Sequence, residues 1–186
     1  EFGLTKDRIA QCMERLTIVE SRYNEEEVGG RKLILHLAKG QNPIACSQAC
    51  GNARQYPGKK TVLLFMDDAH DAAHSVENTA WLYDTDFELL NDPSVVQVVT
   101  AGPRHWDSYV RLLMAGIPQE RLAHEEDPLD AAEHLQLADS DAVFVLYDLY
   151  SVDLSKQVKA KLHERLKTLP PKETHSQEEE VADHEN

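Results

Sequence analysis

The chain has 186 residues, a length that suits one domain with or without a tail. Its formal net charge of -14 argues against a nucleic-acid partner, because phosphate binding needs a basic face. No apolar run reaches the roughly 18 residues of a membrane span and no secretory leader is visible, so no transmembrane segment is expected. The three cysteines, Cys12, Cys46 and Cys50, are an odd and sparse set that favours a reducing cytoplasm over a disulfide framework.

The N-terminal part of the chain contains one helix signal and one hairpin signal. The pattern of residues 5–14 predicts a short helix with Thr5 as its N-cap. Two strand-like runs, 16–23 and 32–37, flank a glutamate-rich stretch over 24–30 that ends in two glycines. A strand, a glycine turn and a second strand predict a β-hairpin.

Strands and helices alternate along the rest of the chain. The strand signals are short apolar runs, and the helix signals are apolar residues at helical spacing with proline or glycine at the ends. The predicted strands are 61–66, 95–100, 122–123 and 142–147, and the predicted helices are 43–55, 79–90, 104–117, 130–138 and 155–166. This alternation predicts an α/β fold, namely a doubly wound, mostly parallel, Rossmann-like sheet with the antiparallel N-terminal hairpin at its edge.

Three parts are expected along the chain: an N-terminal helix and linker over 1–14, one α/β domain over 15–168, and a disordered tail over 169–186. The tail begins near two consecutive prolines and carries six acidic residues against one basic residue. A segment so acidic and so poor in large apolar residues does not bury enough surface to fold.

The loops that follow the predicted parallel strands hold the most unusual polar residues. Right-handed crossovers place these loops along one edge of the sheet, where ligands bind in open α/β folds. The loops contribute Lys39, Asn42, Gln48, the acidic stretch 67–84, Arg104, Asp107 and Asp148. The sequence contains no Walker A motif and no GxGxxG motif, so a phosphate cradle for a nucleotide would lie on another domain.

Part of the acidic stretch suggests a metal site as one hypothesis. His70 and His74 lie four residues apart, so on a helix they would share a face as two metal ligands can. Neighbouring carboxylates at Asp67, Asp68 and Asp71 would add ligands. The spacing is not that of the HExxH motif, and a solvated loop is the simpler interpretation, so no metal is assigned.

The run over 79–90 predicts an amphipathic helix whose apolar side chains, including Trp81, fill the core. Asp84 falls near the same face of this helix as Trp81 and therefore needs a partner. That partner would be a helix N-terminus, Arg104, or an imidazole from another chain. An Asp that orients a His is the third member of a nucleophile–base–acid relay.

Two further groups have a functional and an ordinary interpretation. Lys39 and Asn42 precede a predicted helix and would hold a carboxylate or phosphate together with the free N–H groups of its first turn. Arg104 and Asp107 would form an ordinary surface ion pair at helical spacing, which is the simpler interpretation of these two.

Three segments, taken together and in order, resemble the C-terminal domain of the MurT family, the Mur-ligase-like subunit of lipid II isoglutaminyl synthase. That family carries a KNPxGxNQ-like, a DGxDxSWxWDxxFE-like and a GxRxxDxxxRLxYAG-like segment. This chain has Lys39, Asn42-Pro43 and Gln48, then WLYDTDFE over 81–88, then Gly102, Arg104, Asp107, Arg111-Leu112 and Ala115-Gly116. The order and approximate spacing fit over residues 15–165. The chain departs from the pattern at Asn78 and Ala80, where the family has an acidic residue and a Ser.

The resemblance implies a domain of an ATP-dependent amide ligase in peptidoglycan precursor synthesis. The family's ligase activates the α-carboxyl of D-glutamate in the lipid II stem peptide, and a class I glutamine amidotransferase, GatD, supplies ammonia. ATP and Mg2+ would be bound mainly by a Mur-like central domain that this chain lacks, so the isolated chain is expected to hold no cofactor and to be inactive. The protein would work in the cytoplasm, at the inner membrane face through its lipid-linked substrate.

The resemblance also implies roles for single residues. Asp84 is expected to be catalytic by completing the Cys–His pair of the amidotransferase. Lys39, Asn42 and Gln48 are expected on the nucleotide or substrate side, and the cleft or interface residues would be Trp81, Asp86, Arg104, Asp107 and Arg111. If the family's Asp is the one opposite Asn78, this chain lacks the acid of the relay.

Two rival hypotheses stay open. In the first, the chain is a non-catalytic module of the same fold that docks a partner, and Asn78 and Ala80 reflect lost chemistry. In the second, it is a metal-binding domain that uses the acidic and histidine residues at 67, 68, 70 and 74.

Overall fold

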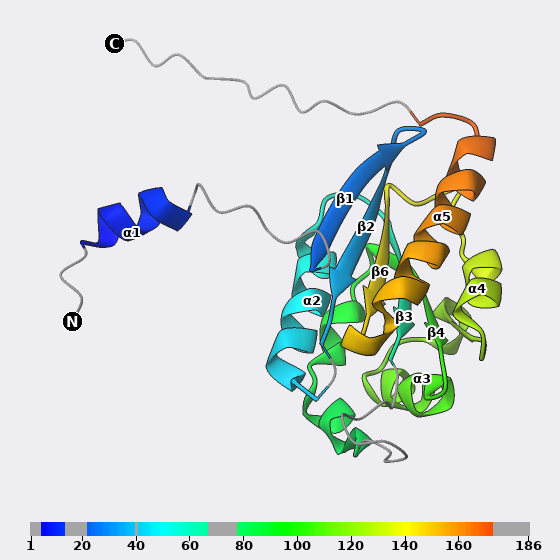
Figure 1. Cartoon of the computed structure of the whole chain (residues 1–186). Helices are drawn as coiled ribbons and strands as arrows, with labels where there is room; N and C mark the ends of the chain where they lie inside the picture. The colour runs from blue at the N-terminus through cyan, green and yellow to red at the C-terminus, as the bar shows by residue number, and fades with distance from the viewer. Residues whose placement is uncertain (1–4, 14–21, 40, 67–77, 173–186) are drawn as a thin grey trace, which may run out of the picture.

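The computed structural model describes residues 5–13, 22–39, 41–66 and 78–172 (Figure 1). Within these residues a six-stranded sheet has the order β1-β2-β6-β3-β4-β5. The strands are β1 (Tyr23–Val28), β2 (Arg31–Leu37), β3 (Lys60–Phe65), β4 (Val95–Ala101), β5 (Leu122–His124) and β6 (Ala142–Tyr147). β1 pairs antiparallel with β2, and the other described strand pairs are parallel. The predicted Rossmann-like sheet with an antiparallel edge hairpin is confirmed.

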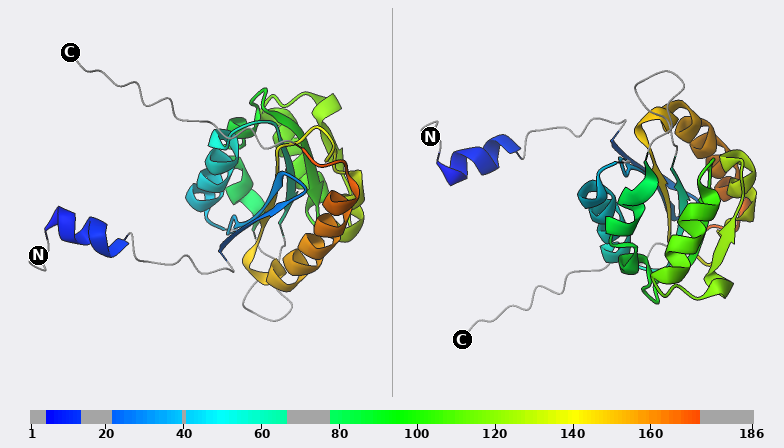
Figure 2. Two further views of the ribbon diagram at one scale, coloured as in Figure 1. Left: turned by 90° about the horizontal axis from the view of Figure 1, so that it is seen from above. Right: turned by 90° about the horizontal axis from the view of Figure 1, so that it is seen from below.

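Two layers of helices cover the sheet, which lies between them in Figure 2. One face carries α2 (Pro43–Gln55), the 3-10 helices η1 (Thr79–Asp84) and η2 (Phe87–Leu90), and α3 (His105–Met114). The other face carries α4 (Pro128–Ala131), η4 (Ala132–His134) and α5 (Val152–Thr168). The remaining elements are α1 (Lys6–Met13), which buries no residue, and the short η3 (Gln119–Arg121) and η5 (Leu149–Ser151).

The core consists of two apolar layers, one on each face of the sheet. Successive residues of a strand point to opposite faces. In β3, Val62 and Leu64 therefore join the layer under α2, whereas Leu63 and Phe65 join the layer under α5. β3 and β6 are buried at every position, which explains why residues 62–65 and 142–147 are continuous apolar runs instead of alternating patterns.

The hairpin differs from its expected boundaries. Residues 24–28, which the sequence analysis assigned to the turn, form most of β1. The turn itself consists of Gly29 and Gly30, whose φ angles of 60° and 74° suit a two-residue hairpin turn. The glutamates are tolerated in the strand because they have basic partners, and Glu26 lies 2.8 Å from the ammonium of Lys159 on α5.

α2 matches its expected range residue for residue. Pro43 occupies the first turn, and the Asn42 side chain accepts a hydrogen bond from the Ala45 N–H at 3.0 Å. α1 likewise begins after its expected cap, since the Thr5 hydroxyl oxygen accepts a hydrogen bond from the Arg8 N–H at 3.3 Å.

The helix expected over 130–138 is wrong in its length. α4 and one 3-10 turn form instead, and helical structure ends at His134. The Gln97 side chain on β4 explains the stop, because it donates to the His134 carbonyl at 3.1 Å and accepts from the Gln136 N–H at 2.8 Å. These bonds occupy backbone groups that a longer helix would use.

The chain after α5 packs on the α/β domain as far as Lys172, beyond the expected domain end at residue 168. The Lys172 N–H donates to the Gly29 carbonyl at 3.0 Å, and the Lys172 ammonium lies 2.6 Å from the Asp141 carboxylate. The buried Arg31 side chain donates to the Pro170 carbonyl at 2.9 Å. The first residues of the expected disordered tail therefore pack on the domain.

Several expectations fall outside the described residues, namely the strand residues 16–21, the stretch 67–77 and the tail residues 173–186. In the part of the chain that the structure describes, no helix is long and apolar enough to cross a membrane. Cys46 and Cys50 are buried in α2, and Cys12 on α1 is exposed.

Candidate functional site

The segment between β3 and β4 is irregular. The single helix expected over 79–90 is wrong, because two 3-10 turns, η1 and η2, are separated by Thr85 and Asp86, with Thr85 in an extended conformation. The Thr85 hydroxyl donates to the Trp81 carbonyl at 3.1 Å. Arg111 of α3 donates to the carbonyls of Leu82 at 3.1 Å and Thr85 at 2.8 Å. Because side chains take these carbonyls, the helical ladder does not continue.

Arg111 anchors this segment. Its side chain is 7% exposed and lies 2.9 Å from the Glu88 carboxylate. Its guanidinium also sits 5.6 Å from the centre of the Phe87 ring. The sequence analysis expected Arg111 in the cleft or at a partner interface. The structure instead buries it beneath the segment, where it fixes the backbone that carries Asp84.

Trp81 and Asn78 also have structural positions. Trp81 packs in the core beneath η1, 8% exposed, and its indole N–H has no hydrogen-bond partner among the described residues. Its predicted place in the cleft or interface is therefore corrected to the interior. Asn78 accepts a hydrogen bond from the Ala80 N–H at 2.9 Å and so caps η1.

Asp84 is exposed at the end of η1. The predicted place of Asp84 beside the buried stripe is corrected to the surface. Its carboxylate has no hydrogen bond or ion pair within the described residues, so of the three expected partners only the imidazole of another chain stays a prediction. The N–H of the neighbouring Asp86 donates to the Ser47 hydroxyl at 2.9 Å. Ser47 lies near the start of α2, which follows the carboxyl end of β2, so Asp84 lies at the carboxyl edge of the sheet.

Asp84 and Asp86 line a surface depression of about 460 Å³ beside the outer face of α2. α2 contributes Ile44 and Gln48 to this depression, and η2 contributes Leu89. Ile44 is 71% exposed, so the rim offers an apolar contact next to two carboxylates. An exposed carboxylate in such a setting is accessible to a side chain of another protein.

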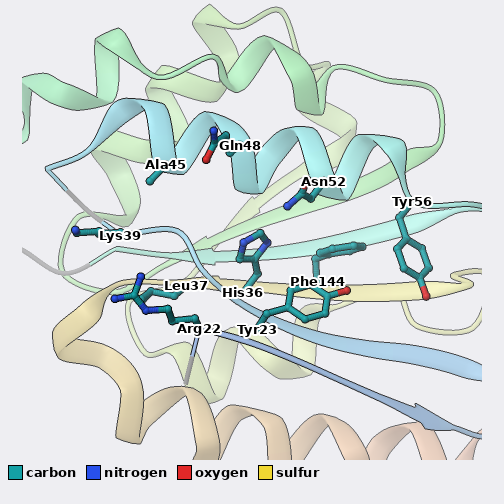
Figure 3. Close-up of a pocket in the computed structure, with 10 residues that line it drawn as sticks. All are labelled: Arg22, Tyr23, His36, Leu37, Lys39, Ala45, Gln48, Asn52, Tyr56 and Phe144. Atoms are coloured by element: carbon teal, nitrogen blue, oxygen red, sulfur yellow. The ribbon is translucent and has the colours of Figure 1, made fainter. Parts of the chain in front are cut away.

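A second pocket, of about 450 Å³, lies between α2 and the β1–β2 hairpin (Figure 3). Lys39 stands at one end of it, and Gln48 lines both this pocket and the Asp84 depression. Asn42 lines neither, because it caps α2. The three residues expected on the nucleotide or substrate side are thus divided between two hollows and a helix cap.

Sequence reasoning missed most residues of the second pocket. They come from distant parts of the chain and share no motif: Arg22, Tyr23, His36, Asn52, Tyr56 and Phe144. The available signal was His36, a polar residue inside the otherwise apolar run KLILHL.

The burial of His36 predicts a pH dependence of stability. Burial lowers the pKa of His36 below its ordinary 6.5, so the folded state favours the neutral ring. As the pH falls below 6.5, the unfolded chain takes up a proton that the folded chain does not, and the free energy of unfolding decreases until the pH passes the folded pKa. Urea unfolding of the wild type and of His36→Phe across this range checks it. Identical pH slopes for the two proteins would contradict the prediction.

Arg104 and Asp107 form the ordinary surface pair. Arg104 Nη1 lies 3.4 Å from Asp107 Oδ2 at the start of α3, and Asp107 is exposed. Such a pair contributes at most about 1 kcal/mol to stability. Neither residue lines the depression with Asp84, and their expected role at a cleft or an interface stays a prediction. Asp148 is buried and accepts a hydrogen bond from the Leu149 N–H, which makes it a cap of η5.

The metal hypothesis rests on a stretch outside the described residues. Asp67, Asp68, His70, Asp71 and His74 all lie in 67–77. Among the residues that the structure does describe, no group of three or more His, Cys, Asp or Glu side chains is arranged to hold a metal ion.

Comparisons with known proteins agree on one family. The family model described as MurT ligase C-terminal matches residues 39–151. The chain is 25% identical over 147 residues to the lipid II isoglutaminyl synthase (glutamine-hydrolyzing) subunit MurT of Streptococcus pneumoniae (strain ATCC BAA-255 / R6), covering 78% of this chain and 31% of that protein. It is 26% identical over 117 residues to the subunit of the same name from Staphylococcus aureus (strain COL), covering 63% of this chain and 26% of that protein. The chain thus spans about a third or less of the length of these relatives.

Solved structures show the same fold. Two crystal structures of MurF from Acinetobacter baumannii superpose with TM-scores of 0.58 and 0.60 at 17% and 16% sequence identity. Each comparison covers 87% of this chain and 34% of the MurF chain. Because the MurT ligase C-terminal model covers more than half of the sequence, including the segments around Asp84 and Arg111, the chain belongs to the MurT ligase C-terminal family.

Proposed function

We propose that this chain is the C-terminal domain of a Mur-ligase-like subunit that, with a glutamine amidotransferase, amidates the D-glutamate of the lipid II stem peptide. Family membership and the name carried by the two relatives support this proposal. The partner would be a class I amidotransferase of the GatD type, and the complex would work in the cytoplasm on a substrate at the inner membrane face.

ATP and Mg2+ would be held mainly by the Mur-like central domain of the whole ligase. ATP supplies the phosphoryl group that activates the D-glutamate carboxyl. In this chain Lys39 fits a secondary phosphate contact, because it is exposed beside the start of α2 with a left-handed φ of 51°. The α2 N-terminus is not a complete phosphate cradle, since Asn42 already accepts the Ala45 N–H. The isolated chain is therefore expected to be inactive.

The observation that carries the proposal is the exposed Asp84 carboxylate at the carboxyl edge of the sheet. Because this carboxylate has no hydrogen bond within the described part of its own chain, it is available to accept a hydrogen bond from the imidazole N–H of the amidotransferase. It would then hold the imidazole in the tautomer that takes the proton from the cysteine thiol, and would stabilise the imidazolium that forms. Arg111 would keep Asp84 in place from below through the Leu82 and Thr85 carbonyls.

Reconstitution tests the proposal. The amidotransferase is assayed for glutamine hydrolysis alone, with the other Mur-like domains, and with those domains joined to this chain. We expect hydrolysis and stem-peptide amidation to appear at full rate only when this chain is present. Equal hydrolysis rates with and without this chain, in a mixture where the complex forms, would refute a role in the relay.

One observation favours the rival docking role. α3 exposes an apolar stripe at helical spacing: Trp106 at 55%, Val110 at 47%, Leu113 at 38% and Met114 at 64%. Exposed aromatic and aliphatic side chains of this kind are typical of protein interfaces. Complex formation without any change in the hydrolysis rate would favour this docking role over catalysis.

A further inference from the structure

We propose that the pocket between α2 and the β1–β2 hairpin binds a small, flat aromatic anion, with aromatic side chains around the ring and Arg22 at the anionic group. Its volume of about 450 Å³ lies within the range of about 300–1,000 Å³ that small-molecule sites occupy. The pocket shares Gln48 and Asn52 with the depression that holds Asp84, but it lies on the hairpin side of α2 and contains neither Asp84 nor Asp86, so the proposal does not rest on the relay role of Asp84.

Aromatic rings form the walls of this pocket. Tyr23 and His36 meet edge to face, with ring centres 5.4 Å apart and planes at 80°. Tyr56 and Phe144 meet in the same way at 5.5 Å and 77°. Rings in these orientations present both faces and edges to the cavity, and a flat ligand packs on them by offset stacking or by edge-to-face contact.

The carboxylate of Glu25 holds two of the aromatic rings, those of Tyr23 and Tyr56, in place. Tyr23 donates its hydroxyl to Glu25 Oε2 at 2.8 Å, and Tyr56 donates to Glu25 Oε1 at 3.0 Å. Burial, followed by the hydrogen bond to Glu25, raises the pKa of Tyr56 to about 12, so it remains a donor at neutral pH. The rings are thus held in place before a ligand arrives, which reduces the entropy lost on binding.

His36 is a polar residue of the pocket whose ring has no hydrogen-bond partner in the part of the chain that the structure describes. Its ring rises from β2 towards α2 in Figure 3, and it makes no hydrogen bond to the described residues. Its Nδ1 is buried and unsatisfied. Nδ1 is shielded from solvent and therefore from a ligand as well, whereas the remainder of the half-buried ring lines the pocket and is open to a ligand. No hydrogen bond from a described residue fixes the tautomer, so the ring can donate to a ligand or accept from it.

The charges at the two ends of the pocket set the polarity of the ligand. Figure 3 shows Arg22 and Lys39 at one end and Tyr56 at the other. Neither cation has an ion pair with a described residue, although the chain as a whole carries a net charge of -14. Two cations without an ion pair among the described residues, next to aromatic walls, favour a ligand with a negative group at one end. An aryl carboxylate and a nucleoside monophosphate both have this chemistry.

Titrating the full chain with both types of ligand, and monitoring the titration by 15N NMR, tests the proposal. The probes are 2-naphthoate and AMP, and their neutral counterparts are 2-naphthamide and adenosine. We expect at least one anion to cause saturable shifts at the pocket residues with a Kd below about 1 mM, and its neutral counterpart to bind at least about tenfold more weakly. No saturable shift with either anion, or equal binding of the neutral compounds, would overturn the proposal.

Two variants separate the site from non-specific binding. Arg22→Gln changes an exposed side chain and should reduce the affinity for the anion to that of its neutral counterpart, about tenfold. Ala45→Phe places a ring from α2 in the cavity and should abolish binding of both. Arg54→Gln removes an exposed cation of the same helix outside the pocket and should leave binding unchanged. Unaltered affinity in Arg22→Gln and Ala45→Phe would refute the site.

Discussion

Replacing Asp84 by Asn is expected to lower the rate of glutamine hydrolysis by the assembled ligase about 10²–10⁴-fold, the scale of loss when a relay carboxylate becomes an amide. The amide has the same shape but offers the imidazole a neutral oxygen or an N–H, and it no longer stabilises the imidazolium. Because Asp84 is exposed and without a partner among the described residues, folding and complex formation should be unchanged. Hydrolysis rates, thermal melting and pull-down of the amidotransferase measure the three effects.

Two neighbouring substitutions control this experiment. Asp86→Asn removes an exposed carboxylate from the same depression and should leave the hydrolysis rate within about threefold of wild type, as expected for a residue outside the relay. Asn78→Asp restores an acid where the family has one, while keeping an oxygen that caps η1. A normal rate in Asp84→Asn together with a higher rate in Asn78→Asp would assign the relay to position 78 and exclude Asp84.

Replacing Arg111 by Met is expected to lower the free energy of unfolding by about 3 kcal/mol, mainly because the carbonyls of Leu82 and Thr85 lose their buried donors. The ion pair with Glu88 adds little, since Glu88 is 57% exposed. For a domain of this size the loss corresponds to a melting temperature lower by roughly 10 °C. Urea and thermal unfolding of the purified chain measure it.

Arg104→Met is the matched control for this substitution. It removes an Arg from the same helix region that is 29% exposed and forms an ion pair with Asp107 on the surface. We expect it to cost less stability than Arg111→Met, because that ion pair is exposed. If the two variants unfold alike, Arg111 does not anchor the segment. If the anchor is real, Arg111→Met should also lower glutamine hydrolysis in the assembled ligase, because Asp84 loses its fixed backbone.

The parts of the fold that the sequence predicts well are those that local chemistry determines. The strands at 61–66 and 142–147 are continuous apolar runs, and Pro43 with Asn42 defines the start of α2. The predicted helix over 79–90 failed for the opposite reason. Its carbonyls are taken by Arg111, a residue more than twenty positions away, and a contact at that separation leaves no sign in the local pattern.

The Asp84 depression and the pocket between α2 and the hairpin differ in the same way, since local sequence indicates the first and not the second. The Asp84 segment was found because WLYDTDFE is a contiguous motif with one acid that the amphipathic pattern did not explain. The pocket between α2 and the hairpin was not found, because β1, β2, α2 and β6 each contribute one to a few ordinary residues to it. Both tyrosine hydroxyls donate to Glu25, and the sequence pattern placed that glutamate in a turn.

The attachment of Lys172 to the hairpin turn offers a point at which the domain can be tethered in a known orientation. Its partners, Gly29 and Asp141, lie at the amino ends of β2 and β6, whereas Asp84 lies at the carboxyl edge. The six residues of β6 separate these edges by about 20 Å. A biotin tag joined after Lys172 would therefore tether the domain to a sensor surface with the Asp84 depression facing the solution, where an amidotransferase in the flow can reach it.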